Sequence, residues 1–98
     1  MALAEADIAF ARDLFADLGA VTTRKMFGGI CLYQDGTVFA FMSSDARLYL
    51  KVSGEMMDEL NAAGAEQFDN MPYYSLPEPA LDDPDEACTL ALRGLAVL

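Results

Sequence analysis

The sequence contains no histidine and no tryptophan, and its only two cysteines, Cys31 and Cys88, lie far apart in apolar contexts. Without histidine the commonest general base is missing, as are the Ser–His and Cys–His pairs that activate nucleophiles. Lysine or carboxylate bases remain as alternatives, but no spacing in the sequence points to them. The cysteines form no CxxC motif, so we expect two buried thiols, no metal site and no cofactor. The protein is therefore not predicted to be an enzyme.

Basic residues are also scarce, with six Lys and Arg against sixteen Asp and Glu and a net charge of −10. So acidic a chain lacks the broad basic face that binds nucleic-acid phosphates or an anionic membrane surface. Long apolar runs are missing as well, so no segment is predicted to span a membrane. The chain begins with Glu5 and Asp7 where a signal peptide would be apolar, so we expect a cytoplasmic protein.

What is present predicts one α+β domain over residues 1–98. Apolar residues from Ala4 to Leu18 recur at steps of four and three and predict a helix over Ala2–Leu18. Asp35-Gly36 predicts a tight hairpin, and Gly28-Gly29 a bulge or sharp bend. The strands predicted around these turns are Thr22–Phe27, Ile30–Gln34, Thr37–Met42 and Arg47–Val52.

The second half of the chain returns to helices. A helix is predicted over Gly54–Ala63, followed by extended pieces at Glu66–Phe68 and Met71–Leu76 that prolines restrict to sheet edges. Asp83 is expected to cap a last helix that starts at Pro84, which explains the acidic run 82–86 without a metal ion. The predicted order is α-β-β-β-β-α-β-β-α, an antiparallel meander with helices packed against it.

The central hairpin is apolar on both faces. Strict alternation directs Phe39 and Phe41 one way and Val38, Ala40 and Met42 the other. Because a sheet with one wet face would alternate apolar and polar residues, both faces must be covered. Helices cover one; another helix, a second subunit or a ligand covers the other. This pattern favours a homodimer or another protein contact.

Several residues are candidates for contacts with a partner. Arg24-Lys25 is the only adjacent basic pair, and it predicts a solvated strand edge or, less simply, an anion contact with Arg47 and Lys51 on the same patch. Tyr73-Tyr74 predicts edge packing or stacking on a ligand or base. A small-molecule pocket between sheet and helix, near Phe39, Tyr49 and Tyr73, is the third interpretation. The full set of candidate residues is Arg24, Lys25, Phe39, Phe41, Tyr49, Tyr73 and Tyr74.

The order and spacing of several short pieces resemble the N-terminal domain of the TfoX/Sxy family of bacterial competence regulators. The resemblance covers nearly the whole chain, and no single piece would suffice. The pieces are Arg24-Lys25-Met26-Phe27-Gly28-Gly29, Leu32-Tyr33, Asp35-Gly36, Phe39-Ala40, Leu48-Tyr49-Leu50-Lys51 and Met71-Pro72-Tyr73-Tyr74.

The resemblance implies a small antiparallel sheet with helices against it, similar to secretion-chaperone-like folds. It implies a role in transcription regulation beside the cyclic-AMP receptor protein, and it brings no catalytic residues. Competence regulators of the family also carry a helical C-terminal domain, so we expect a stand-alone N-terminal domain here. Three functions are thus carried forward: a homodimeric protein-interaction module, a nucleic-acid contact, and a small-molecule-binding domain.

Overall fold

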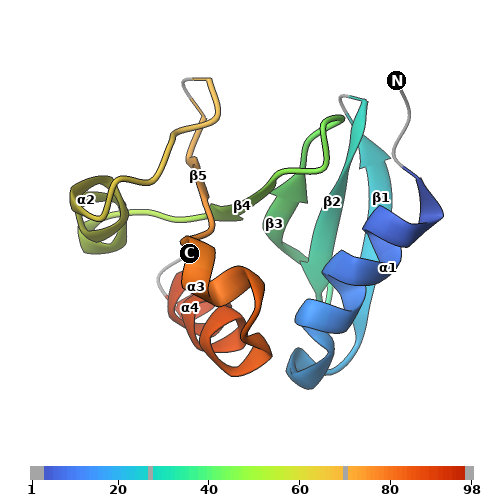
Figure 1. Ribbon diagram of the computed structural model, residues 1–98. Coiled ribbons are helices and arrows are strands. Elements are labelled where there is room, and N and C mark those ends of the chain that lie inside the picture. Colours follow the sequence, from blue (N-terminus) through green and yellow to red (C-terminus); the bar gives the residue numbers. More distant parts are fainter. Residues whose placement is uncertain (1–3, 27, 70, 97–98) are drawn as a thin grey trace.

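The computed structural model describes residues 4–26, 28–69 and 71–96. The five strands form one antiparallel sheet in the order β1-β2-β3-β4-β5, which confirms the α+β meander (Figure 1). In chain order the elements are α1 (Glu5–Leu14), the 3₁₀ turn η1 (Ala16–Leu18), β1 (Val21–Met26), β2 (Gly29–Gln34), β3 (Thr37–Met42), β4 (Leu48–Lys51), α2 (Glu55–Ala62), β5 (Tyr73–Ser75), α3 (Glu78–Leu81) and α4 (Pro84–Ala96).

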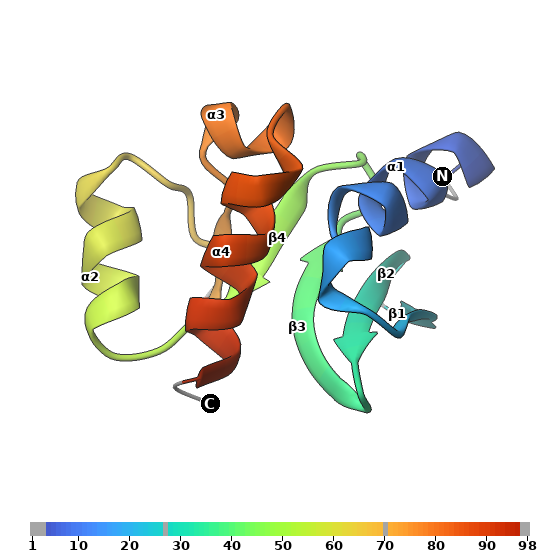
Figure 2. The same cartoon turned by 90° about the horizontal axis from the view of Figure 1, so that it is seen from below.

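The helices gather on one face of the sheet. Figures 1 and 2 show α4 between α1 and α2, with α1 over the β1–β3 side. Phe15, at the end of α1, is fully buried and meets Phe39 of β3 edge-on, with 5.1 Å between the ring centroids. Ala87 and Ala91 of α4 are buried in the same core. Small residues there allow the helix to lie close to the sheet.

A β-bulge in β3 changes the predicted pattern of the hairpin. Leu32 pairs with Ala40 but Tyr33 pairs with Val38, so Phe39 is an extra residue in β3. Phe39 and Ala40 therefore both belong to the core under the helices, whereas Phe41 belongs to a second cluster. The prediction that Phe39 and Phe41 share a face is wrong, because the bulge interrupts the alternation between them.

The second face of the sheet, opposite the helices, is covered by the chain itself. Phe41 and Tyr49 are buried there under Phe68, whose ring centroid lies 4.9 Å from that of Phe41 and 5.1 Å from that of Tyr49. Phe68 comes from the segment between α2 and β5. The covering layer is thus a loop and not a helix, and the two-faced hairpin by itself demands no second subunit.

The glycine pair gives the predicted sharp bend and not the bulge. Met26 pairs with Gly29, so the β1–β2 connection is a two-residue hairpin in which Gly28 has a φ of +78°. A Cβ on Gly29 would lie 2.0 Å from the Met42 carbonyl oxygen. Gly29 therefore permits a close approach of β2 to the end of β3.

Most of the other predicted elements shift only at their ends, with two exceptions in the second half of the chain. Glu66–Phe68 gives one isolated bridge, from Gln67 to Tyr74, in place of a strand, and the short helix α3 was not expected. The Asp83 carboxylate accepts hydrogen bonds from the backbone N–H groups of Asp85 and Glu86, at 3.1 and 3.4 Å, so the predicted cap of α4 is confirmed. Within the described residues, no helix is long and apolar enough to cross a bilayer.

A few predicted positions fall outside the described residues. They are Ala2 and Leu3 of the first predicted helix, Phe27 at the end of the first predicted strand, and residues 97 and 98 at the end of the final predicted helix.

Candidate interaction surfaces

The strand register divides the predicted site residues between the two faces of the sheet. Arg24, Cys31, Phe41, Tyr49 and Ser75 form one continuous row across all five strands on the second face. Lys51 and its partner Tyr73 lie on the same face.

The remaining three candidates lie on the helix side. Phe39 and Tyr74 are buried in the main core, and Lys25 pairs with Ile30 of that core at the edge strand. Four basic residues were predicted to share one patch. Arg24 and Lys51 lie on the second face and Arg47 lies beside its Tyr49 ring, whereas Lys25 lies on the helix side.

The strands carry no acidic residue, although the whole chain has sixteen. On the second face the strands therefore contribute two basic residues, Arg24 and Lys51, and no acidic one. Arg47 donates a hydrogen bond to Glu66 (Nη1–Oε2 3.0 Å), which raises the pKa of the guanidinium, and its Cζ lies 5.9 Å from the centroid of the Tyr49 ring.

Burial raises the pKa of the Cys31 thiol, an effect that nearby Lys51 partly opposes.

The aromatic residues of this face leave little room for a ligand. Tyr49 is buried against Phe68, and the hollow between Cys31, Phe41 and Tyr73 measures about 10 Å³. That is space for about one water molecule. The predicted small-molecule pocket beside Phe39, Tyr49 and Tyr73 does not form, because Phe39 lies on the opposite face from the two tyrosines.

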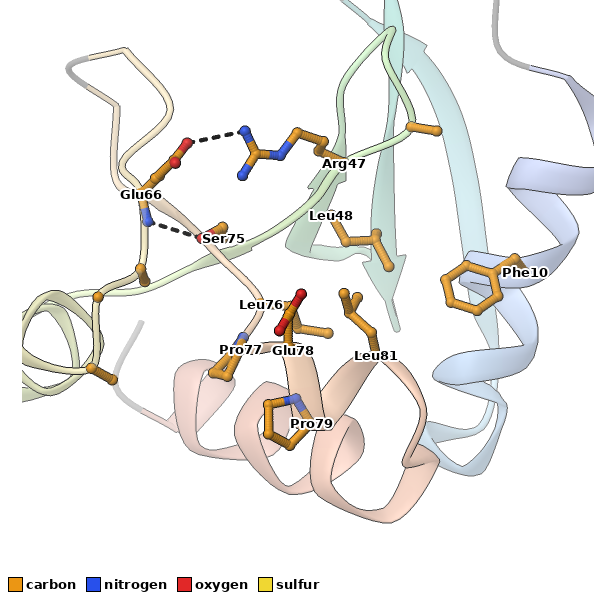
Figure 3. Close-up of a pocket in the computed structure, with 14 residues that line it drawn as sticks. Phe10, Arg47, Leu48, Glu66, Ser75, Leu76, Pro77, Glu78, Pro79 and Leu81 are labelled. Carbon is orange, nitrogen blue, oxygen red and sulfur yellow. Dashed lines mark hydrogen bonds and ion pairs between the residues drawn. The ribbon is translucent and has the colours of Figure 1, made fainter.

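A larger hollow, not predicted from the sequence, lies on the helix side between α1 and the β4–β5–α3 region. We call it the Phe10 groove; its volume is about 630 Å³. Figure 3 shows the ring of Phe10 on one side, with Leu48 and Leu81 across from it. Phe10 is 46% exposed although it is a large apolar side chain. Leu76, Pro77 and Pro79 complete much of the apolar lining.

Three polar residues of the Phe10 groove already have partners, and Glu78 is the fourth polar residue of its lining. Arg47 pairs with Glu66, whose backbone N–H donates to the Ser75 hydroxyl at 2.9 Å (Figure 3). A small ligand is oriented by a few convergent, available polar groups. The groove instead combines apolar side chains with polar groups that are mostly paired, which suits a segment of protein better than a metabolite.

A second hollow of about 280 Å³ continues the Phe10 groove along α1. It shares Phe10 and Leu81 with the first and adds Asp13 and Asp82. The sequence held one signal for this site: Phe10 lies off the apolar stripe that predicts the buried face of the first helix.

Metal chemistry finds no support in the described part of the chain, where no group of three or more Cys, Asp or Glu side chains is arranged to hold an ion. Asp83, in the acidic run before α4, is used instead for capping.

The sequence matches the model of one known protein family. The model of the TfoX N-terminal domain matches residues 13–98, and the protein belongs to this family. No curated protein sequence matches the chain. The match begins within α1 and covers all five strands, so both surfaces described above lie largely within the family domain.

Proposed function

We propose that the protein is a non-enzymatic interaction domain acting in transcription regulation, and that it binds a segment of a partner protein in the Phe10 groove. The observation that supports it is the half-exposed Phe10 ring, which faces Leu48 and Leu81 across a hollow of about 630 Å³. Covering the exposed half of the Phe10 ring contributes about 1 kcal/mol to binding. Membership of the TfoX N-terminal domain family supports the regulatory role.

A peptide display library selected on the purified protein tests this proposal. Selected peptides should lose binding to Phe10→Asp, which places a charge in the groove. Leu92→Asp is the matched control, because Leu92 is 56% exposed on α4 and does not line the groove. Peptides that bind both variants as they bind the parent protein would contradict a role for the groove, provided that circular dichroism shows both variants folded.

Homodimer formation remains a prediction of this proposal. The apolar second face of the sheet no longer supports a homodimer, because Phe68 of the same chain covers it. The acidic surroundings of the Phe10 groove oppose a second copy there, because each copy carries a net charge of −10. A homodimer would therefore use another surface, and light scattering at increasing protein concentration detects it.

A nucleic-acid contact is the second candidate function, and the cations of the second face favour it. Arg24 and Lys51 share that face with the partly exposed Tyr33 and Tyr73, a combination of cations and rings that suits single strands, whereas Arg47 is already paired with Glu66. Labelled single-stranded DNA should bind at low salt and weaken in an Arg24→Glu/Lys51→Glu variant. No change in anisotropy at low salt, where attraction is strongest, would remove this candidate.

A further inference from the structure

We infer that the Phe10 groove takes a basic amphipathic helix of a partner protein. The inference rests on the proposed function and adds the chemistry of the partner. It starts from the charges around the groove. Glu66 and Glu78 line the groove, and Asp13 and Asp82 line its continuation, whereas Arg47 is the only cation among the described residues that line either part.

The single cation is also neutralised. Arg47 pairs with Glu66 at 3.0 Å, and the described lining holds no second cation to pair with Asp13, Glu78 or Asp82. Asp13 lies on α1, and the other two lie on or beside α3. Acidic groups therefore flank the apolar lining on both walls, where they attract cations on either side of a ligand's apolar stripe.

The shape of the groove favours a helix. Its walls are α1 on one side and the β5–α3 connection on the other, and the ring of Phe10 faces Leu48 and Leu81 across the gap (Figure 3). An amphipathic helix presents apolar side chains at i, i+3, i+4 and i+7 along such a channel. Lysines or arginines next to that stripe then lie near the two acidic walls.

Two designed peptides test this chemistry directly. Both are about 18 residues long, so that each can form a helix, and both carry leucine at the same helical positions. One has lysine at the polar positions and the other glutamate. Each is labelled with fluorescein, and binding to the full chain is measured by fluorescence anisotropy.

Matched variants separate the groove from the overall charge. Asp13→Lys/Glu78→Lys reverses the two walls, and Glu55→Lys/Asp58→Lys reverses two residues of α2 that line neither part of the groove. Each double variant raises the net charge by four, from −10 to −6. Phe10→Asp tests the apolar contact, and circular dichroism checks that all three fold.

The lysine peptide should bind the parent protein at least about tenfold tighter than the glutamate peptide. The wall variant and Phe10→Asp should each weaken that binding about tenfold or more, whereas the α2 variant changes it about twofold at most. Equal loss in the two charge variants, or binding that Phe10→Asp leaves intact, would mean general attraction to an acidic protein and overturn the inference.

Two further outcomes separate this inference from the proposed function. If the glutamate peptide binds as tightly as the lysine peptide and Phe10→Asp abolishes both, the groove binds helices but the basic partner is wrong. If neither peptide binds, the basic-helix inference is overturned, and the display selection described above decides independently whether the groove binds any protein segment.

Discussion

Gly29 shows at the residue scale how a missing side chain fixes the geometry of the sheet. A Cβ there would meet the Met42 carbonyl oxygen at 2.0 Å, so Gly29→Ala forces two strands apart and should cost about 2–3 kcal/mol of unfolding free energy. Gly19→Ala is the control, because φ is +96° there but no atom lies within 4 Å of the added Cβ. It should cost only about 1 kcal/mol. Urea unfolding measures both, and equal losses would contradict the steric argument.

Three buried or half-buried groups predict a fall in stability at alkaline pH. Burial is the largest cause that raises the pKa of Cys31, of Cys88 and of Tyr73. The folded chain therefore keeps protons that the unfolded chain releases above its ordinary pKa values. The stabilisation is complete below about pH 8 and is lost as pH rises through the folded-state values, above about pH 9.

Urea midpoints measured between about pH 7 and about pH 10 test this expectation. The midpoint should fall above about pH 8.5, and a Cys31→Ala/Cys88→Ala variant should show a smaller fall relative to its own value at pH 7. A midpoint that stays constant or rises over this range would contradict the prediction.

Single residues also mark the limit of pattern analysis. Alternation along β3 assigns Phe39 and Phe41 to one face, and it fails because the bulge depends on the pairing of β2 with β3, which no single strand encodes. The hairpin turn at Asp35-Gly36 was predictable, since both residues have positive φ, at 53° and 84°.

The start of α4 supplies a prediction at the scale of elements. Asp83→Ala removes a carboxylate that accepts two backbone hydrogen bonds and should cost about 1 kcal/mol. The neighbouring Asp82→Ala is the control, because Asp82 is exposed and precedes the capping position. Thermal unfolding of both variants should show the larger drop for Asp83→Ala; an equal drop would mean that the two carboxylates act only through their charge.

The covering segment between α2 and β5 gives a second prediction at this scale. Phe68→Ala uncovers Phe41 and Tyr49 and should cost about 2 kcal/mol, since Phe68 is only partly buried. Phe10→Ala should cost less than about 1 kcal/mol, because Phe10 is 46% exposed. Urea unfolding compares the two. A reversed order would indicate that the Phe10 groove, and not the second face, depends on its phenylalanine for stability.

Most elements follow from local signals, and those that differ depend on tertiary contacts. The helical period predicts α1, and Asp83-Pro84 predicts the start of α4. Residues Glu66–Phe68 were expected to form a strand but make only one bridge, and the side chain of Phe68 packs on the second face of the sheet. A loop that covers a sheet has no period, so sequence pattern does not distinguish it from an edge strand.

The charge of the whole molecule governs its self-association. Two copies at −10 each repel, and added salt screens that repulsion. We therefore expect the predicted homodimer to tighten as NaCl rises from about 50 mM to about 500 mM, measured by sedimentation velocity. A dimer that weakens with salt would mean that the cations on the second face of one copy contact the acidic surface of another.

The candidate surfaces differ in how far the sequence predicts them. The cations of the second face were partly foreseen, because strand pairing brings Arg24 and Lys51 onto one side. The Phe10 groove was not, because it exists only where α1 faces β4, β5 and α3, elements more than thirty residues away along the chain. Its walls come from packing and not from a motif.

The extra residue in β3 adds a ring to the main core and leaves the strand beyond it in register. Removing Phe39 would leave Val38 and Ala40 opposite the neighbouring residues Tyr33 and Leu32, so the ladder would become regular and Phe41 and Met42 would stay on their present faces. What the deletion would take away is the ring that meets Phe15 in the main core, so a chain without this position needs another large side chain there.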